Sequence, residues 1–292
     1  MQLSGRLFVL LSLCLLGVQP PASAAQPGPL DILLVNDDGW DAVGIQAMKT
    51  ALSAAGHNVT VIAPLTNQSG KSASLTLDLV PVQQMSANEF AVEGTPATCV
   101  FLGVSGILAQ RPHLVVSGTN HGLNVGPATP FSGTVGATIA ALRAGLPAIA
   151  LSSDPPVDDP ADPAFIQHYA NVASFAVRLI QRLKSTNPTP GVLPARTALN
   201  VNYPTLAPSQ VQGVLVRVQG VAADGILTYT EVAPGLFVPS AGPPPPGEME
   251  VPGADGPAVE AGFITVVPID GNYTAGNNLL FLIALLLGGL QP

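Results

Sequence analysis

The feature that most constrains this chain is a short apolar run that leads directly into two adjacent carboxylates. The run from Ile32 to Val35 is followed at once by Asn36-Asp37-Asp38-Gly39. A few apolar residues that end at a glycine turn are typical of a buried strand in a parallel sheet, and α/β proteins bind ligands at the carboxyl ends of such strands. Because unpaired buried charge is costly, the carboxylates need a partner. A divalent cation would neutralise them, whereas the alternative is that Asp38 caps the helix expected at residues 44–55.

From residue 31 to about residue 152, short apolar runs alternate with stretches of helical periodicity. This alternation predicts repeated β-α-β units and hence an α/β fold with a doubly wound, mostly parallel sheet. Residues 74–92 alternate apolar and polar side chains in two pieces, which predicts an added hairpin or edge strands. The expected strands are 32–35, 59–63, 114–117 and 148–152, and the expected helices are 44–55, 95–108 and 134–144.

After residue 152 the pattern changes. A loop at 154–163 and a long amphipathic helix at 165–183 precede a region dominated by strands and loops. Pro243 to Pro246 can form neither a helix nor a central strand, so residues 234–257 are expected to be an exposed, partly mobile excursion. Leu279 to Leu290 is apolar but too short to span a membrane, which predicts a buried or partner-facing terminal helix. The later strands are expected at 198–202, 211–218, 226–232 and 263–268.

The first residues have the pattern of an export signal. Arg6 precedes an apolar stretch from Leu7 to Leu16, and Ala22-Ser23-Ala24 matches the small residues that signal peptidase accepts. Residues 1–24 are therefore predicted to be a signal peptide, with the mature protein beginning at Ala25 in the periplasm or outside the cell. Cleavage would leave one cysteine, Cys99, and no internal disulfide. We expect a single domain over 25–292, with its core at 31–202 and a C-terminal extension at 203–292.

The net charge of −8 argues against a nucleic acid polymer as partner, because such binding depends on Lys and Arg side chains. A small anionic substrate would need a metal ion or backbone donors instead.

Three further loops are expected at the same edge of the sheet as Asp37 and Asp38, because the carboxyl ends of parallel strands lie together. They contribute the Ser69 hydroxyl, the Asn120 amide oxygen and a helix start at Ser132 to Thr134. Carboxylate, hydroxyl and amide oxygens are ligands that Mg²⁺, Mn²⁺ or Ca²⁺ prefers, and a helix start stabilises an anion. A metal ion beside an anion site is the minimum needed to transfer a phosphoryl group to water.

Each of these segments also has a structural interpretation when it is taken alone. Ser69-Gly70 is more often a turn than a ligand, and Ser132 could simply cap a helix. The glycine-rich run 118–126 could be a connection, since it lacks the Gly-Lys-Ser/Thr of a Walker loop and the spacing of a dinucleotide motif. Their joint occurrence on successive loops favours the functional interpretation.

Three other residues have a functional and a packing interpretation. Cys99 lies in an apolar helical pattern, which favours packing over a role as nucleophile. His121 lies beside the predicted ligand loop and could protonate a leaving group or contact the substrate. Trp40 could anchor the core or offer a stacking surface to a nucleobase.

Asn36 distinguishes between two phosphatase mechanisms. Phosphatases of the haloacid dehalogenase type carry Asp-x-Asp-Gly at a strand end, and their first Asp forms a covalent aspartyl phosphate. Asn36 occupies that position here, and an amide cannot form the intermediate. A metal-activated water is therefore the predicted nucleophile.

The residues from Ile32 to Ser152 resemble the SurE survival-protein family, also called 5′/3′-nucleotidases or SurE-type acid phosphatases. A weaker similarity returns at 200–204 and 262–268. The segments that carry the resemblance are ILLVNDDG (32–39), Gly44-Ile45, VIAP (61–64), Asn67, Ser69-Gly70, Ser74-Leu75-Thr76, Gly94-Thr95-Pro96, Cys99-Val100, VVSG (115–118), Asn120, Asn124, Gly126 and Ser132 to Val135.

The resemblance implies a Rossmann-like three-layer sandwich with a C-terminal strand and loop extension, which assembles as a homodimer or homotetramer. It implies release of phosphate from nucleoside 5′- or 3′-monophosphates with one divalent ion per subunit, Mg²⁺ or Mn²⁺. The implied metal ligands are Asp37, Asp38, Ser69 and Asn120, and either aspartate could act as the catalytic base. The expected substrate-binding residues are Asn36, Gly70, Asn124, Ser132, Gly133 and Thr134.

The chain departs from the family pattern in three places. Thr98 stands where the family usually has Asp, and Thr119 where it usually has Ile. The proline-rich segment around Pro243 is unlike the usual dimerisation arm. An export signal is also unusual for this family. Thr98 and Thr119 flank the site without supplying a proposed ligand, so activity is expected to survive these changes. Because one fold can host different functions, the second hypothesis is an exported nucleotide-binding or small-anion-binding protein that uses the same scaffold without turnover.

Overall fold

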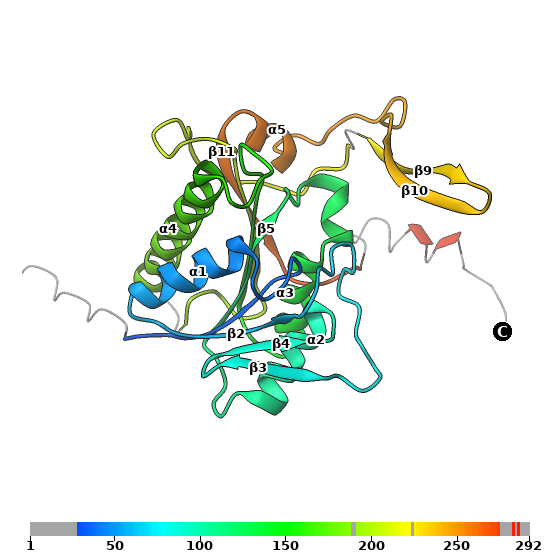
Figure 1. Ribbon diagram of the computed structural model, residues 1–292. Helices are drawn as coiled ribbons and strands as arrows, with labels where there is room; N and C mark the ends of the chain where they lie inside the picture. The colour runs from blue at the N-terminus through cyan, green and yellow to red at the C-terminus, as the bar shows by residue number, and fades with distance from the viewer. Residues whose placement is uncertain (1–27, 188–190, 223–224, 275–281, 284, 287–292) are drawn as a thin grey trace, which may run out of the picture.

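A nine-stranded sheet runs through the middle of the molecule in this computed structural model (Figure 1), which describes residues 28–187, 191–222, 225–274, 282–283 and 285–286. In spatial order the strands are β3 (Val82–Ser86), β4 (Glu89–Val92), β2 (Asn58–Pro64), β1 (Asp31–Val35), β5 (Leu114–His121), β6 (Ala148–Ser153), β7 (Ala198–Tyr203), β11 (Phe263–Ile269) and β8 (Gly213–Val216). The strands from β4 to β7 in this order are all parallel, whereas β3 pairs antiparallel with β4, and β11 pairs antiparallel with β7. The sheet is therefore mostly parallel, as expected.

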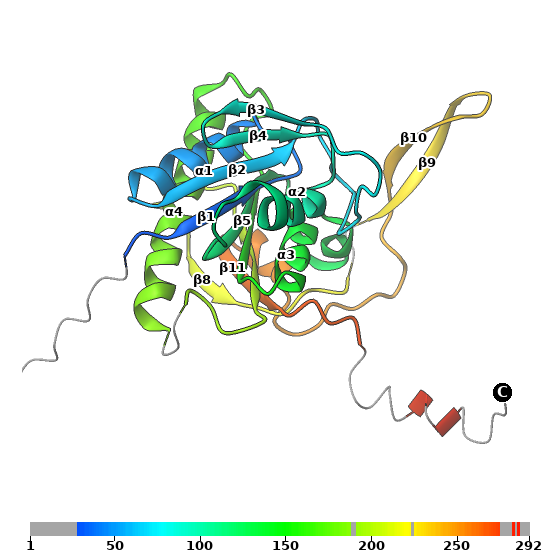
Figure 2. The same ribbon diagram turned by 90° about the horizontal axis from the view of Figure 1, so that it is seen from below.

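Helices cover both faces of this sheet (Figures 1 and 2). On one face lie α1 (Val43–Ala54) and α4 (Pro163–Thr186), and on the other lie α2 (Pro96–Leu102) and α3 (Gly133–Arg143). Strand β1 supplies both cores by alternation: Ile32 and Leu34 pack with α1 and α4, whereas Leu33 and Val35 pack with α2 and α3. The molecule is thus the predicted three-layer α/β sandwich.

The order of the strands reverses at β1. The chain runs from β1 outward through β2 to β4, and then returns to place β5, β6 and β7 on the other side of β1. In open α/β sheets, ligands bind in the crevice at the carboxyl ends of the strands where this reversal occurs. That crevice lies between the ends of β1 and β5.

The expected elements of the first half are present, with two differences. The helix predicted at 95–108 is α2 followed by a π-helical segment, η1 (Gly103–Ile107). It packs closely on the sheet, because a Cβ at Gly103 would lie 3.0 Å from Ile62. Strand β5 was expected to end at Ser117, but it continues as far as His121. Its pairing with β6 is irregular between Ser117 and Asn120. The polar residues of this extension gave it the pattern of a loop.

The C-terminal extension contributes to the central sheet through β8 and β11 and also forms a separate arm. The arm, residues 226–242, is a hairpin of β9 (Ile226–Ala233) and β10 (Leu236–Gly242) that projects from the body (Figure 2). The excursion predicted at 234–257 is mostly exposed, as expected, but residues 236–242 within it form a strand that pairs along β9. Helix α5 (Asp255–Glu260) begins inside the same predicted excursion.

Two predictions fall largely outside the described residues. The signal peptide at 1–24 lies wholly outside them, as does most of Leu279 to Leu290. The apolar residues described in that second segment are between 45% and 69% exposed, so they are not buried; they are Leu282, Ile283, Leu285 and Leu286. Within the part of the chain that the structure describes, no helix has both the length and the apolar character needed to cross a bilayer.

Candidate functional site

The Asp37-Asp38 turn at the end of β1 is hydrogen-bonded to each of the other three predicted loops. The Asp37 carbonyl oxygen accepts the N–H of Gln68 at 2.7 Å. The Asp37 carboxylate accepts the Thr134 hydroxyl at 2.5 Å, and the Asp38 carboxylate accepts the N–H of His121 at 3.0 Å. The convergence expected from strand topology is therefore confirmed.

The two carboxylates form a largely buried acidic pair. Burial raises the pKa of Asp37, while the Thr134 hydroxyl and backbone groups of Asp37, Thr134 and Gly133 oppose that rise. Burial and the neighbouring charge of Asp37 raise the pKa of Asp38 to about 7, against the lowering effect of the His121 N–H. Within the described ranges neither carboxylate is in a salt bridge. The pair therefore lacks the positive charge that would offset its burial.

Residues next in sequence to this pair and to its hydrogen-bond partners carry neutral side-chain oxygens. Asn120 donates its Nδ2 to the Gly122 carbonyl oxygen at 2.8 Å, which leaves its Oδ1 available as a ligand. Asn36 donates its Nδ2 to the Gly39 carbonyl at 2.7 Å, while its buried Oδ1 has no hydrogen-bond partner in the described part of the chain. Ser69 is exposed in a turn that is closed by the Asn67 side chain.

This donor set fits a hard divalent cation. No cluster of three or more His, Cys, Asp or Glu side chains suited to a metal exists among the residues described, so an ion here would depend on neutral oxygens beside the two aspartates. Carboxylate, amide and hydroxyl oxygens are the ligands that Mg²⁺ and Mn²⁺ accept. The predicted ligands Asp37, Asp38, Ser69 and Asn120 therefore remain a chemically consistent set.

The start of α3 lies against the acidic pair. Ser132 caps this helix, since its hydroxyl accepts the N–H of Val135 at 3.1 Å. A Cβ at Gly133 would lie only 2.8 Å from Asp37 Oδ2, so glycine allows the helix to approach the carboxylate. The Thr134 hydroxyl supports Asp37. Contacts of these three residues with a substrate stay predictions.

Asn124 is the centre of a buried network. Its side chain donates to Ser152, its backbone N–H donates to Asn202, and its carbonyl accepts from Asn200, Asn202 and Thr129, at distances from 2.7 to 3.1 Å. These bonds fix the loop after β5. Gly70 lies in a turn with a φ of 75°, a conformation that favours glycine. The substrate contacts predicted for Asn124 and Gly70 are untested.

Cys99, Trp40 and His121, which each have a functional and a packing interpretation, all pack against other side chains in the structure. Cys99 is buried in the core of α2 and α3, and burial raises its thiol pKa, so the packing interpretation is confirmed. Trp40 packs against the core of α1 and α4. The His121 ring packs edge-on against Phe165, with 5.6 Å between ring centroids.

Tyr169 on α4 lies beside this site, and sequence reasoning missed it. Its ring packs edge-on against Phe165, which packs against the His121 ring. Its hydroxyl is buried without a hydrogen-bond partner among the described residues, and its pKa is raised by burial and by the charges of Asp38 and Asp154. The sequence around Tyr169 shows only the apolar face of an amphipathic helix. No signal in it pointed to the site.

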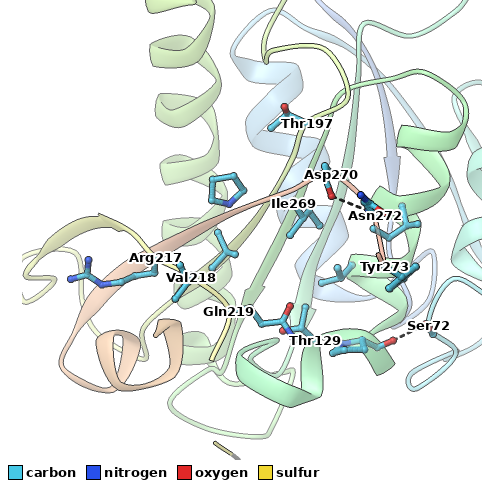
Figure 3. Close-up of a pocket in the computed structure, with 17 residues that line it drawn as sticks. Ser72, Thr129, Thr197, Arg217, Val218, Gln219, Ile269, Asp270, Asn272 and Tyr273 are labelled. Carbon is cyan, nitrogen blue, oxygen red and sulfur yellow. Dashed lines mark hydrogen bonds between the residues drawn. The ribbon is translucent and has the colours of Figure 1, made fainter. Parts of the chain in front are cut away.

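A cavity of about 710 Å³ lies elsewhere, between α3, the end of β11 and residues 217–219 (Figure 3). Ser72, Thr129 and Arg217 are among its lining residues. None of the four predicted metal ligands lines it. The candidate catalytic site is therefore the crevice at the ends of β1 and β5.

The comparisons with known proteins agree with one another. The family model described as survival protein SurE matches residues 32–224. The chain is 38% identical to the 5′-nucleotidase SurE of Stenotrophomonas maltophilia (strain K279a), over 89% of this chain and 96% of that protein. It is 36% identical to the 5′-nucleotidase SurE of Actinobacillus succinogenes, over 86% and 96%. The crystal structure of SurE protein from Aquifex aeolicus is similar with a TM-score of 0.71 and 30% identity, over 88% of this chain and 99% of that one.

Proposed function

The chain belongs to the survival protein SurE family, and from this membership we propose that it is a nucleotidase, a phosphomonoesterase that releases phosphate from nucleoside monophosphates. The relatives that match nearly all of its length carry the name 5′-nucleotidase. The observation that carries the proposal is the buried Asp37-Asp38 pair, which is hydrogen-bonded to the loop after β2, to β5 and to the start of α3.

We propose that one divalent ion per subunit, Mg²⁺ or Mn²⁺, is held by Asp37, Asp38, Ser69 and Asn120. The uncompensated carboxylates support this. When bound, such an ion offsets charge on the phosphate and lowers the pKa of a water molecule.

The chain's own residues hold this site in position before substrate arrives. The Thr134 hydroxyl orients Asp37, and the His121 N–H orients Asp38. Backbone N–H groups at the start of α3 would orient the phosphate oxygens, because a helix start favours negative charge. The hydrogen bond from the Thr134 hydroxyl to Asp37 places this helix start at the site. Pre-positioned groups of this kind lower the entropic cost of reaching the transition state.

The test is phosphate release from a panel of 5′- and 3′-nucleoside monophosphates, with Mn²⁺, with Mg²⁺ and with EDTA. We expect metal-dependent release, and we expect Asp37→Asn and Asp38→Asn each to lower kcat/KM at least about 100-fold. Full activity of metal-replete Asp37→Asn would contradict the mechanism. Tight nucleotide binding without phosphate release in the presence of any of the metals would favour the second hypothesis, an exported nucleotide-binding or small-anion-binding protein.

We further propose that the protein is exported after cleavage behind Ala24, and that it forms a homodimer or homotetramer. The apolar side chains exposed along the arm support assembly, because exposed apolar patches commonly mark protein interfaces. Mass spectrometry of the mature N-terminus checks the export proposal, with Ala25 as the expected first residue. Protein that retains Met1 in the cytosol would contradict export.

A further inference from the structure

The loop that joins β5 to α3 is held by the base of the arm. The arm root, residues 217–222 and 250–256, consists of the two segments that flank the arm in the sequence. They pair with each other through a bridge between Val218 and Ala254. The arm root also contacts Gly126, the first residue of the 3₁₀ helix η2 (Gly126–Phe131) that leads to Ser132.

Asp255 is the centre of this contact. Its side chain is fully buried, and its Oδ1 accepts the N–H groups of Gly126 at 3.1 Å, Gly220 at 2.8 Å and Gly256 at 3.0 Å. Gln219 completes the contact by donating its Nε2 to the Gly126 carbonyl oxygen at 3.0 Å. Both backbone polar groups of Gly126 are therefore satisfied by the arm root. Gln219 lies beside Thr129 of η2 in the cavity wall (Figure 3).

The position of Gly126 makes this contact relevant to the site. Two residues earlier, Asn124 is bonded to Asn200 and Asn202 of β7. Six residues later, Ser132 begins the helix that faces Asp37. The loop is thus held by β7 at Asn124 and by the arm root at Gly126. Near its end it is also held by Ser72, which donates to the carbonyl oxygens of Pro130 at 2.7 Å and Phe131 at 3.1 Å. The arm root therefore supplies the anchor between the other two.

We propose that Asp255 is a positioning residue, which acts through Gly126 to fix the loop that presents Ser132 to Thr134 to the phosphate. This inference rests on the proposed function for what the loop binds, but not for how the loop is held. Removing the carboxylate leaves the buried N–H of Gly126 without an acceptor, and an unsatisfied buried donor destabilises the conformation that buries it. The second carboxylate oxygen of Asp255 is buried and has no hydrogen-bond partner among the described residues, so this side chain acts through the three N–H groups that its Oδ1 accepts, one of which belongs to the loop.

Glu250 offers a matched control. It belongs to the same arm root, and its Oε1 accepts the N–H groups of Val221 at 2.8 Å, Ala222 at 3.4 Å and Val251 at 2.8 Å. It makes no hydrogen bond to Gly126 among those of the described residues. A variant at Glu250 therefore weakens the arm root without removing an acceptor from the loop.

The experiment compares Asp255→Ala, Asp255→Asn and Glu250→Ala by amide hydrogen exchange and by steady-state kinetics. In Asp255→Ala we expect amide hydrogen exchange at residues 124–134 to become about tenfold faster. We also expect KM for nucleotide and the inhibition constant of inorganic phosphate to rise about tenfold, whereas kcat should change less than about threefold. Asp255→Asn keeps an acceptor oxygen and should restore much of the protection. Glu250→Ala should speed exchange only at 219–222 and 250–251.

Two results would overturn the inference. One is wild-type exchange at 124–134 and a wild-type phosphate inhibition constant in both Asp255 variants. The other is an equal effect of Glu250→Ala on that loop, which would reduce Asp255 to general support of the arm root. If the wild-type protein hydrolyses no nucleotide, the proposed function fails, but the exchange comparison still decides whether Asp255 holds the loop.

Discussion

The site and the arm both depart from the usual pattern of a folded protein, in which apolar side chains are buried and charged side chains are exposed. At the ends of β1 and β5, carboxylates and amides are buried, whereas the arm presents large apolar side chains to solvent. Scattered exposed apolar residues are ordinary, but buried charge and clustered exposed apolar surface are informative. Each region lacks a partner that a single chain does not supply: positive charge for the site and apolar surface for the arm. The exposed apolar residues of the arm are Ile226, Leu227, Tyr229, Val232, Leu236, Phe237 and Val238.

The strongest test of the site is Gly133→Ala, because it moves a buried carboxylate without changing any charge. A Cβ at Gly133 would lie 2.8 Å from Asp37 Oδ2, so Asp37 or the start of α3 must shift. We expect kcat/KM to fall about 100-fold and the free energy of unfolding to fall by about 1–3 kcal/mol.

Gly256→Ala is the matched control, since Gly256 also lies in the first turn of a helix and a Cβ there meets only Val125, at 3.9 Å. This variant should keep wild-type activity and stability. Equal effects of the two substitutions would show that the approach of Gly133 to Asp37 does not matter.

Metal addition tests whether the site lacks positive charge. Mn²⁺ at about 100 times its dissociation constant should raise the free energy of unfolding by about 2.7 kcal/mol, because it binds only the folded site. Thermal unfolding with Mn²⁺ and with EDTA measures this. Asp38→Asn should abolish the shift, and substitutions in the arm should leave it unchanged. The same melting temperature with Mn²⁺ and with EDTA would contradict the proposed ligand set.

His168 provides the contrasting case of a buried polar group whose partner lies in the chain. Its Nε2 lies 2.6 Å from the Ser153 hydroxyl, and that hydroxyl donates to the Tyr203 carbonyl, so the imidazole donates to Ser153. His168→Gln should lower the free energy of unfolding by about 1–2 kcal/mol at pH 7.5. Urea titrations of the two proteins at several pH values measure this difference.

The difference should also depend on pH. Burial lowers the pKa of His168 in the fold, so its contribution is fully present above the unfolded pKa and is lost as the pH falls through the folded value. The difference in free energy of unfolding between wild type and His168→Gln should therefore become smaller from pH 7.5 toward pH 5. His57, whose pKa is also lowered by burial, is present in both proteins and cancels. A gap that widens on acidification would contradict this account.

The smallest effect on the folded chain is expected in the arm. Replacing Leu227 and Phe237 with Ser should change the free energy of unfolding of the monomer by no more than about 0.5 kcal/mol, because both side chains are exposed. The same double variant should convert the oligomer to monomer in sedimentation velocity. Leu79→Ser, at an exposed position outside the arm, is the control that should leave the assembly intact. A wild-type protein that sediments as a monomer would contradict the assembly proposal.

Much of the fold could be predicted because periodicity is local. The alternation in β1 and the apolar runs of β2, β5 and β6 are visible in the sequence, and the loops that follow them converge by topology alone. The end of β5 could not be predicted, since Gly118 to His121 form a strand only through pairing with β6. In the arm, the strand expected at 226–232 is β9, but β10 was missed for a related reason: residues 236–242 become a strand because β9 lies beside them.

The candidate site, too, could be predicted only in part. Asp37, Asp38 and the loops that meet them follow from residue type and strand order. The role of Thr134 as support for Asp37 and the ring contacts that lead from His121 through Phe165 to Tyr169 depend on distances between residues far apart in the chain. Asp255 was equally invisible, because an acidic residue beside a proline-rich segment gives no sign that it is buried.

The two aspartates at the end of β1 lie above different layers of the sandwich. Asp37 is bonded to α3, whereas Asp38 is bonded to His121, whose ring packs against Phe165 of α4 on the opposite face. An ion shared by the two would fasten together two hydrophobic cores that otherwise meet only through the sheet. Neither helical layer could then unfold separately without releasing the ion. Loading the site should therefore make unfolding more cooperative, so that probes on the two faces report one transition at one temperature.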